Sequence, residues 1–424
     1  MAPQETMPKT TPAPLPTGTF SVLAQVDFRW LFLGNILANA AQWIQGVTMS
    51  WIVYEWTSSG TILGSLNLVS TFATLGLAPL AGVAIDRLSH RRLMLFTNSW
   101  FLAINLALGL TLLSGLTRVW PLFLFTLLGG MALAIDQPLR QTVLFTLVPR
   151  RLAPNAVALL QTGWATMRTL GPAIGGTLLL WIGPGGNFLV QAGAFALITW
   201  TIVHLVFPPK PESGPKTATF SNLKLGLGYV MGDANTRTFF LMGWILSLFT
   251  IPIFVVMPAI YASDIFRGGP EVLGYLLSAI GLGGVIAGLV VVSLKRVDRR
   301  GLVGVAGLLG LSLSLAGFAI SAHLWLSLLL LALAGFCEMV FIITNQTLLQ
   351  LSIPDELRGR VNGIITLSNG LVPIGSLVAG SGADWLGPRP TTLLLSAAAG
   401  LVSLIALLTS RTLREYRLSR GLDG

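Results

Sequence analysis

The chain has 424 residues, of which 53% are hydrophobic and only 10% are Asp, Glu, Lys or Arg, with a net charge of +10. Soluble domains carry charge on about a quarter of their residues, so this composition excludes an ordinary soluble fold, which could not cover its surface. It predicts a protein surrounded mainly by lipid. The single cysteine, Cys337, excludes an intrachain disulfide, and no Cys/His cluster indicates a metal site.

Along the chain, a Pro- and Thr-rich stretch comes first, and it predicts a disordered tail at residues 1–27. Crossing a bilayer takes roughly 20 apolar residues in a helix. Six segments of this kind follow, near residues 30–54, 60–85, 93–115, 119–147, 156–181 and 187–207. After a polar stretch come six more, near residues 238–262, 272–294, 302–322, 324–351, 361–385 and 391–410.

These segments predict an all-α membrane protein with twelve transmembrane helices in two six-helix bundles. The first bundle covers residues 28–207 and the second covers residues 238–411. The polar stretch 208–237 is predicted as a linker loop, and residues 412–424 as a C-terminal tail.

The basic residues indicate the orientation. An even number of spans places both termini on one side of the membrane, and most of the 26 Lys and Arg then fall on that side. The opposite loops hold only Arg118, Arg267 and Arg389. This asymmetry predicts that both termini are cytoplasmic, and it explains the basic charge without a nucleic-acid partner.

A short internal repeat agrees with the division into two bundles. The sequence Gln141-Thr-Val-Leu, followed by Val148-Pro149, recurs as Gln346-Thr-Leu-Leu followed by Ile353-Pro354. The match places the fourth predicted span on the tenth, as a duplication of six helices requires.

The loop after the second span carries a family resemblance. It contains a glycine, an Asp-Arg pair and two further arginines: Gly82, Asp86, Arg87, Arg91 and Arg92. This pattern resembles the signature of the major facilitator superfamily, from which it departs at Ser89, where the family usually has glycine. The resemblance implies the major facilitator fold and a cytoplasmic gate at these residues, where charge pairs hold the two halves together in the outward-facing state.

Three further stretches resemble the branch that includes bacterial siderophore and macrolide exporters. They are Asp136-Gln-Pro-Leu-Arg140, Arg168 to Gly176, and Asn345-Gln346 with residues 354–361. The Gly171-Pro172-Ala-Ile-Gly175-Gly176 run also resembles a motif of proton-coupled antiporters, and these residues suit close helix packing and a bend. The resemblance alone implies export, a proton gradient as energy source without a cofactor, and the bacterial inner membrane as location.

Charged residues deep in a membrane mark functional or structural sites. Asp136 and Arg168 lie at a common predicted depth of ~18–20 Å in neighbouring antiparallel spans. We therefore predict an Asp136–Arg168 ion pair, with Arg140 one turn from Asp136 sharing the carboxylate. A structural or switching role for this pair is favoured, and proton carriage by Asp136 is the alternative.

Glu338 is the other deep acid. It lies near the middle of the tenth span, and no basic residue lies at the same depth in the second half of the chain. Burial without a partner favours the protonated form of a carboxyl group. Glu338 is thus a candidate proton-coupling site, and a permanently neutral glutamic acid bonded to a carbonyl is the alternative.

In the family that the sequence resembles, spans 1, 4, 7 and 10 line a central cavity. Asn35, Asn39 and Gln42 form a polar stripe on span 1, which lines that cavity or bonds to other helices. The other candidates for the cavity wall are Trp43, Trp164, Trp244, Met257, Asn345 and Gln346. Lipid-facing positions are the alternative for the tryptophans.

The sequence thus predicts a monomeric secondary transporter that exports an amphipathic or lipophilic small molecule, such as a siderophore or a drug, in exchange for protons. The same fold also allows an importer, a lysophospholipid flippase or a membrane sensor that moves nothing. An enzyme is disfavoured because the three histidines are dispersed and no pair of acidic residues is clustered at a catalytic spacing. The sequence has no GxxxxGK(S/T) loop, which argues against ATP hydrolysis.

Overall fold

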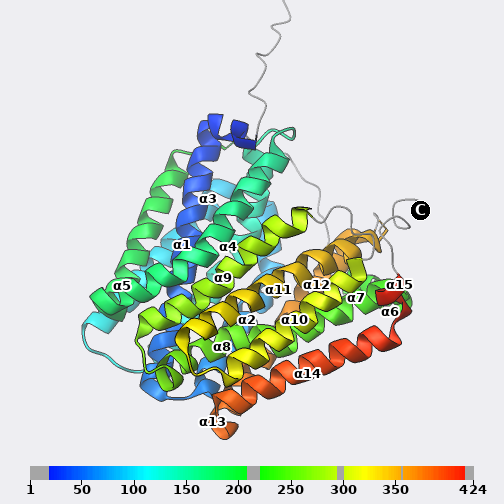
Figure 1. The fold of residues 1–424 in the computed structure, drawn as a ribbon. Helices are drawn as coiled ribbons and strands as arrows, with labels where there is room; N and C mark the ends of the chain where they lie inside the picture. The colour runs from blue at the N-terminus through cyan, green and yellow to red at the C-terminus, as the bar shows by residue number, and fades with distance from the viewer. Residues whose placement is uncertain (1–18, 208–219, 294–299, 355–356, 416–424) are drawn as a thin grey trace, which may run out of the picture.

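The computed structural model describes residues 19–207, 220–293, 300–354 and 357–415, and within these ranges almost every residue is helical and none is in a strand. The predicted tails fall largely outside the described residues. The first part of the predicted linker, residues 208–219, also lies outside them, but from Phe220 onward the stretch predicted as a loop is almost entirely helical. Two groups of helices, which we call the N half and the C half, meet at one end and fan apart toward the other (Figure 1).

The N half consists of five long helices after a short 3-10 turn at Thr19–Ala24. They are α1 (Val26–Thr57), α2 (Gly60–Arg87), α3 (His90–Leu113), α4 (Trp120–Leu147) and α5 (Ala153–Val203). The 51-residue α5 is interrupted at Gly183, whose φ of 68° is a left-handed conformation that glycine adopts without strain. Its two arms therefore cover the fifth and sixth predicted segments.

The C half begins after a short helix that packs on it, α6 (Phe220–Gly232). Its first span is built from α7 (Ala234–Ile245), α8 (Ile251–Ile260) and two π-helical turns, Leu246–Thr250 and Tyr261–Ile265. The remaining elements are α9 (Pro270–Ser293), α10 (Arg300–Ile320), α11 (Leu324–Leu351), α12 (Arg358–Ser368), a 3-10 turn (Asn369–Leu371), α13 (Val372–Leu386), α14 (Pro388–Thr409) and α15 (Arg411–Glu415).

Nine helical stretches among the described residues are long and apolar enough to cross a membrane, with α5 counted as one. The surface agrees with a lipid environment, because large apolar side chains are exposed on many helices. Four tryptophans at helix ends, Trp120, Trp181, Trp325 and Trp385, are between 59% and 89% exposed. Alternation of helix direction places them at the same end of the molecule, as in the aromatic belt of a membrane interface.

The internal repeat corresponds to two helices of equal length. Helices α4 and α11 both have 28 residues, and each ends a few residues before the repeated Pro149 and Pro354. Each also carries one buried carboxylate, Asp136 in α4 and Glu338 in α11. The two halves thus place comparable helices on the two sides of the molecule.

The halves pack together along two pairs of helices, α5 with α9 and α2 with α13. We call one end of the molecule the closed end. It contains the α1–α2 turn at Ser58 and the start of α9 at Pro270. The opposite end, where α2 finishes at Arg87 and α4 at Leu147, is the open end. Glycines allow the contact at the closed end, because a Cβ on Gly60 or Gly64 would meet the backbone of α13.

This packing predicts a large difference between two glycines of α2. A Cβ on Gly64 would lie 2.4 Å from the carbonyl oxygen of Ser376, whereas a Cβ on Gly76 would have no neighbour within 4 Å. Gly64→Ala should destabilise this arrangement by about 1–3 kcal/mol, because the backbones must separate. Gly76→Ala should be neutral or stabilising, since alanine is the better helix former. Equal melting temperatures of the two purified variants would contradict the packing.

Candidate functional site

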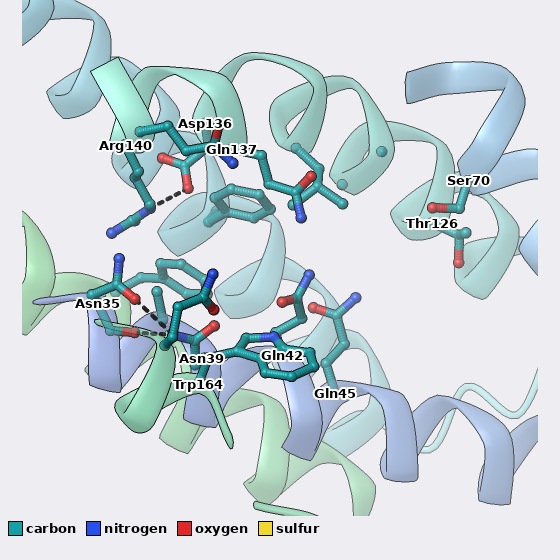
Figure 2. Close-up of a pocket in the computed structure, with 18 residues that line it drawn as sticks. Asn35, Asn39, Gln42, Gln45, Ser70, Thr126, Asp136, Gln137, Arg140 and Trp164 are labelled. Carbon is teal, nitrogen blue, oxygen red and sulfur yellow. Dashed lines mark hydrogen bonds and ion pairs between the residues drawn. The ribbon is translucent and has the colours of Figure 1, made fainter. Parts of the chain in front are cut away.

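A cavity of about 390 Å³ lies among helices of the N half, between α1, α4 and the first arm of α5. Asn35, Asn39, Gln42 and Gln45 follow one face of α1, as the predicted polar stripe requires (Figure 2). Asp136, Gln137 and Arg140 of α4 lie across from them (Figure 2). The wall also includes Gln141, Gln161, Trp164, Leu133 and the rings of Phe101 and Phe195. We call this space the amide cavity.

Two further cavities extend the open space. One of about 260 Å³ shares Gln45, Ser70 and Thr126 with the amide cavity and reaches the C half at Phe254 and Leu277. Trp43 lines it. The other, of about 160 Å³, lies in the C half and is lined by Asn345 and Gln346 of α11. The structure therefore places most of the predicted cavity residues in the walls of three cavities, two of which adjoin each other.

Two predicted cavity residues lie elsewhere. Met257 is fully buried in the core of the C half, because its face of α8 packs on neighbouring helices. Trp244 lines none of these three cavities, and its ring packs on Phe240 with the centroids 5.4 Å apart. Helical spacing from the sequence could not distinguish these faces of the seventh span.

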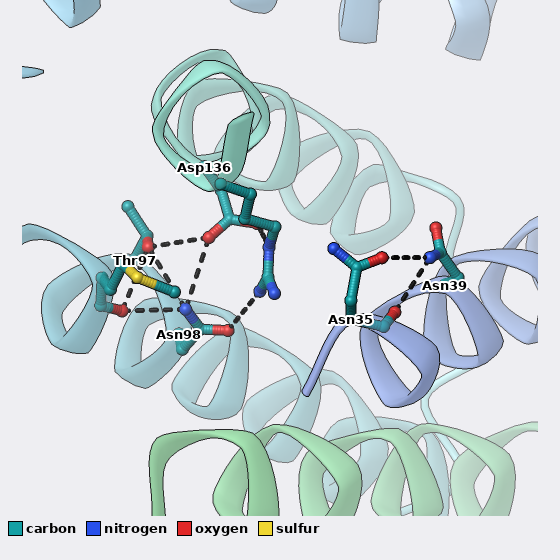
Figure 3. A network of polar contacts seen from close by, with 7 residues as sticks. Asn35, Asn39, Thr97, Asn98 and Asp136 are labelled. Carbon is teal, nitrogen blue, oxygen red and sulfur yellow. Dashed lines mark hydrogen bonds and ion pairs between the residues drawn. The ribbon is translucent and has the colours of Figure 1, made fainter. Parts of the chain in front are cut away.

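Asp136 belongs to a buried polar network within the N half. Arg140 Nε lies 2.5 Å from Asp136 Oδ2, and Arg140 also donates to Asn98 Oδ1 at 2.8 Å. Thr97 Oγ1 donates to Asp136 Oδ1 at 3.0 Å, and Asn98 Nδ2 donates to the same oxygen at 3.3 Å (Figure 3). The carboxylate is thus matched by one cation and two neutral donors from α3, as a buried charge requires.

The predicted Asp136–Arg168 pair is wrong. Arg168 Nη2 instead lies 2.5 Å from Glu338 Oε2, so this ion pair joins α5 of the N half to α11 of the C half. The two side chains are only 13% and 6% exposed. Arg168 also lies over the ring of Trp164, 5.6 Å from its centroid. Glu338 has a basic partner after all, because the partner comes from the other half of the chain.

The closed end holds two carboxylates that the sequence analysis did not select. Asp264 of the C half accepts a hydrogen bond from Tyr54 Oη of the N half at 2.6 Å. Asp384 of α13 accepts from the backbone N–H groups of Gly60 and Thr61, at 2.6 and 3.0 Å, and from the hydroxyls of Ser59 and Thr61. It therefore caps the N-terminus of α2 from the opposite half. The Ser59-Gly60-Thr61 sequence is typical of a helix N-terminus, but it does not indicate that Asp384 caps this one.

The two sequence motifs on which the family resemblance rests lie at opposite ends of the molecule. Gly82, Asp86, Arg87, Arg91 and Arg92 are all exposed at the open end, and Arg91 donates to the carbonyl of Val203 within the N half. The Gly171–Gly176 run lies toward the closed end.

The glycine run acts through close packing. A Cβ on Gly171 would meet Trp43, one on Gly175 would meet Ile44, and one on Gly176 would lie 2.4 Å from the carbonyl oxygen of Pro270. The Pro172 carbonyl in turn lies against Gly274 of α9. The non-helical residue of α5 is Gly183 rather than Pro172.

Solved structures share this fold. A bacterial homologue of the human lysosomal transporter Spinster, in an inward-facing and unoccupied conformation, superposes with a TM-score of 0.73 at 15% identity, covering 92% of this chain and 98% of that chain. At this level of identity the likeness shows that the chain shares the fold of a transporter of the major facilitator type. The chain belongs to the family described as Transmembrane secretion effector, which it matches over residues 17–418.

Curated relatives are similar over nearly their whole length. The staphyloferrin A transporter of Staphylococcus aureus is 24% identical and covers 91% of this chain and 97% of its own. The multidrug efflux pump Tap of Mycolicibacterium fortuitum is 25% identical, covering 92% and 97%. The enterobactin exporter EntS of Shigella boydii is 25% identical, covering 92% and 93%. The resemblance to the siderophore and efflux branch is confirmed.

Proposed function

We propose that this chain is a proton-coupled exporter of a small amphipathic molecule, a siderophore or a drug, in the inner membrane of a bacterium. The observation that carries the proposal is the buried Arg168–Glu338 ion pair between the two halves, beside a polar cavity. The names of the relatives support export of a siderophore or a drug, since they describe an enterobactin exporter and a multidrug efflux pump.

The distribution of charge supports an orientation. Arg87, Arg91, Arg92, Arg150 and Arg151 are exposed at the open end, whereas the four most exposed tryptophans, Trp120, Trp181, Trp325 and Trp385, lie at the closed end. Basic residues concentrate on the cytoplasmic side of inner-membrane proteins. The open end is therefore cytoplasmic in our proposal, both termini lie there, and the twelve predicted spans cross the bilayer as two bundles.

In this orientation the structure represents an inward-facing state. The outer side is held shut by Tyr54 with Asp264 and by Asp384 at the start of α2. Opening that side requires these contacts to break while the cytoplasmic side closes, which is alternating access by rocking of two bundles. The exposed Asp86, Arg87, Arg91 and Arg92 then form the cytoplasmic gate of the opposite state.

Protonation of Glu338 couples this movement to the gradient. An ionised Glu338 attracts Arg168 strongly in a poorly hydrated site, whereas the protonated acid does not, so proton binding weakens a link between the halves. A proton taken up from the outside is released to the cytoplasm when the pair forms again. Asp136, paired with Arg140 inside one half, is proposed to keep the shape of the cavity instead.

Reconstituted vesicles test the proposal. Copies inserted with the cytoplasmic face outward should accumulate substrate when the vesicle lumen is acidic, tested with a panel of siderophores, macrolides and lysolipids. Glu338→Gln should abolish this uphill accumulation and retain downhill exchange, because only the proton-dependent step is lost. Glu55→Gln, which changes an exposed acid of α1, is the control.

Two results would count against the proposal. Undiminished uphill accumulation by Glu338→Gln would remove Glu338 from the coupling step. Absence of gradient-driven movement of every compound in the panel by the wild-type protein would remove the transport function itself.

A further inference from the structure

The amide cavity is polar and yet carries no unmatched charge. Seven of its lining side chains are amides, from α1, α4 and α5. Among the described residues, the charged side chains in its lining are Asp136 and Arg140, which pair with each other. The described residues that line the adjoining cavity beside Trp43 include no charged side chain. A ligand in this space therefore meets dipoles rather than a net charge.

Most of these amides are free to bind a ligand. The side-chain N–H groups of Asn39 donate to the backbone oxygen and to Oδ1 of Asn35, so these groups are already used within α1. Within the part of the chain that the structure describes, the side chains of the five cavity glutamines form no hydrogen bond with the protein. Each glutamine offers two N–H donors and a carbonyl acceptor, so the wall matches a ligand with hydroxyl, amide and carbonyl groups.

An apolar side of the same cavity complements this polar wall. Phe101 and Phe195 stack with their centroids 4.9 Å apart, and both line the cavity together with Trp164 and Leu133. A planar or hydrophobic part of a ligand can pack there while its polar groups face the amides.

We infer that the amide cavity selects a ligand that is uncharged when bound, rich in hydroxyl, amide or carbonyl groups, and equipped with a planar apolar part. This inference rests on the proposed transport function and narrows its substrate class, which the sequence predicted only as an amphipathic or lipophilic small molecule. The reason is electrostatic. An ion moved from water into a site without a counter-charge loses hydration that amides replace only in part, whereas neutral polar groups exchange one set of hydrogen bonds for another.

Three coumarin glycosides of one scaffold test the inference. 4-Methylumbelliferyl glucoside is neutral, the corresponding glucuronide is an anion, and the 6-amino-6-deoxyglucoside is a cation. Binding to the full-length protein in nanodiscs is measured by equilibrium dialysis without a proton gradient. The glucoside should bind about tenfold or more tightly than either charged analogue, a difference of about 1.4 kcal/mol.

Charged variants of Gln45, which lines both the amide cavity and its neighbour, provide the second readout. Gln45→Lys should raise the affinity for the glucuronide about tenfold, and Gln45→Glu should do the same for the amine, since each supplies the missing counter-charge. Thr142→Lys is the matched control, because Thr142 is exposed on α4 beside Gln141 but does not line the cavity.

The binding results decide whether the amide cavity prefers an uncharged ligand. Equal or tighter binding of a charged analogue to the wild-type protein overturns the inference, as does failure of the glucoside to bind. Both results leave gradient-driven transport of another compound standing. Preferential binding of the glucoside without gradient-driven transport of any compound supports the selectivity of the cavity and removes the transport proposal.

Discussion

Glu338→Leu and Arg168→Leu should each lower the stability of the protein by about 3–5 kcal/mol, because each leaves an uncompensated charge in a buried site. The double variant Arg168→Leu/Glu338→Leu should recover most of this loss, since an apolar pair of similar volume removes both charges. Recovery of stability should not restore proton-driven transport. Denaturant titration of the four proteins in lipid nanodiscs measures the free energies of unfolding.

Exposed residues of the same charge types serve as controls for this double-mutant cycle, which consists of the wild type, the two single variants and the double variant. Glu55→Leu and Arg151→Leu change residues outside the buried pair, and each should alter stability by less than about 1 kcal/mol. Additive effects of Arg168→Leu and Glu338→Leu would show that the two side chains do not interact. Restored uphill transport in the double variant would show that the pair is structural only.

A second double-mutant cycle tests which arginine interacts with Asp136. Asp136→Asn should be strongly destabilising, because it leaves Arg140 without its counter-charge and weakens two hydrogen bonds from α3. Its effect should be non-additive with that of Arg140→Gln, since the two residues share one interaction, but additive with that of Arg168→Gln to within about 0.5 kcal/mol. Unfolding free energies of the single and double variants check both statements.

This cycle distinguishes the structure from the pairing that the sequence suggests. If Asp136 were paired with Arg168, the effects of their substitutions would be coupled by an energy on the order of 0.5–3 kcal/mol. Strong coupling of Asp136 with Arg168 and none with Arg140 would contradict the Asp136–Arg140 ion pair (Figure 2).

Much of the candidate site could be predicted from single-helix patterns. Asn35, Asn39 and Gln42 recur at helical spacing, so the sequence was sufficient to place them on one face of α1, and the cavity lies there. Asp136 and Arg140 are four residues apart and pair with each other, as neighbouring turns of one helix permit. Interactions of this kind depend only on the local geometry of an α-helix.

The errors arise where two helices must be placed relative to each other. Depth along the membrane suggested Asp136 as the partner of Arg168, but depth is one coordinate, and the rotation of α5 turns Arg168 toward α11. Asp264 and Asp384 lie far in sequence from Tyr54 and Gly60, so no local pattern connects them. Met257 is buried for the same reason, since only packing decides which face of α8 meets the core.

Composition and the period of one helix were sufficient to predict the lipid environment, the helical segments, the repeat of α4 in α11 and the polar face of α1. The packing of the helices was needed to show that the Arg168–Glu338 pair joins the halves, that two carboxylates close one end, and that seven amides line one cavity. Those features depend on how helices rotate and pack, which is set by contacts summed over both halves of the chain.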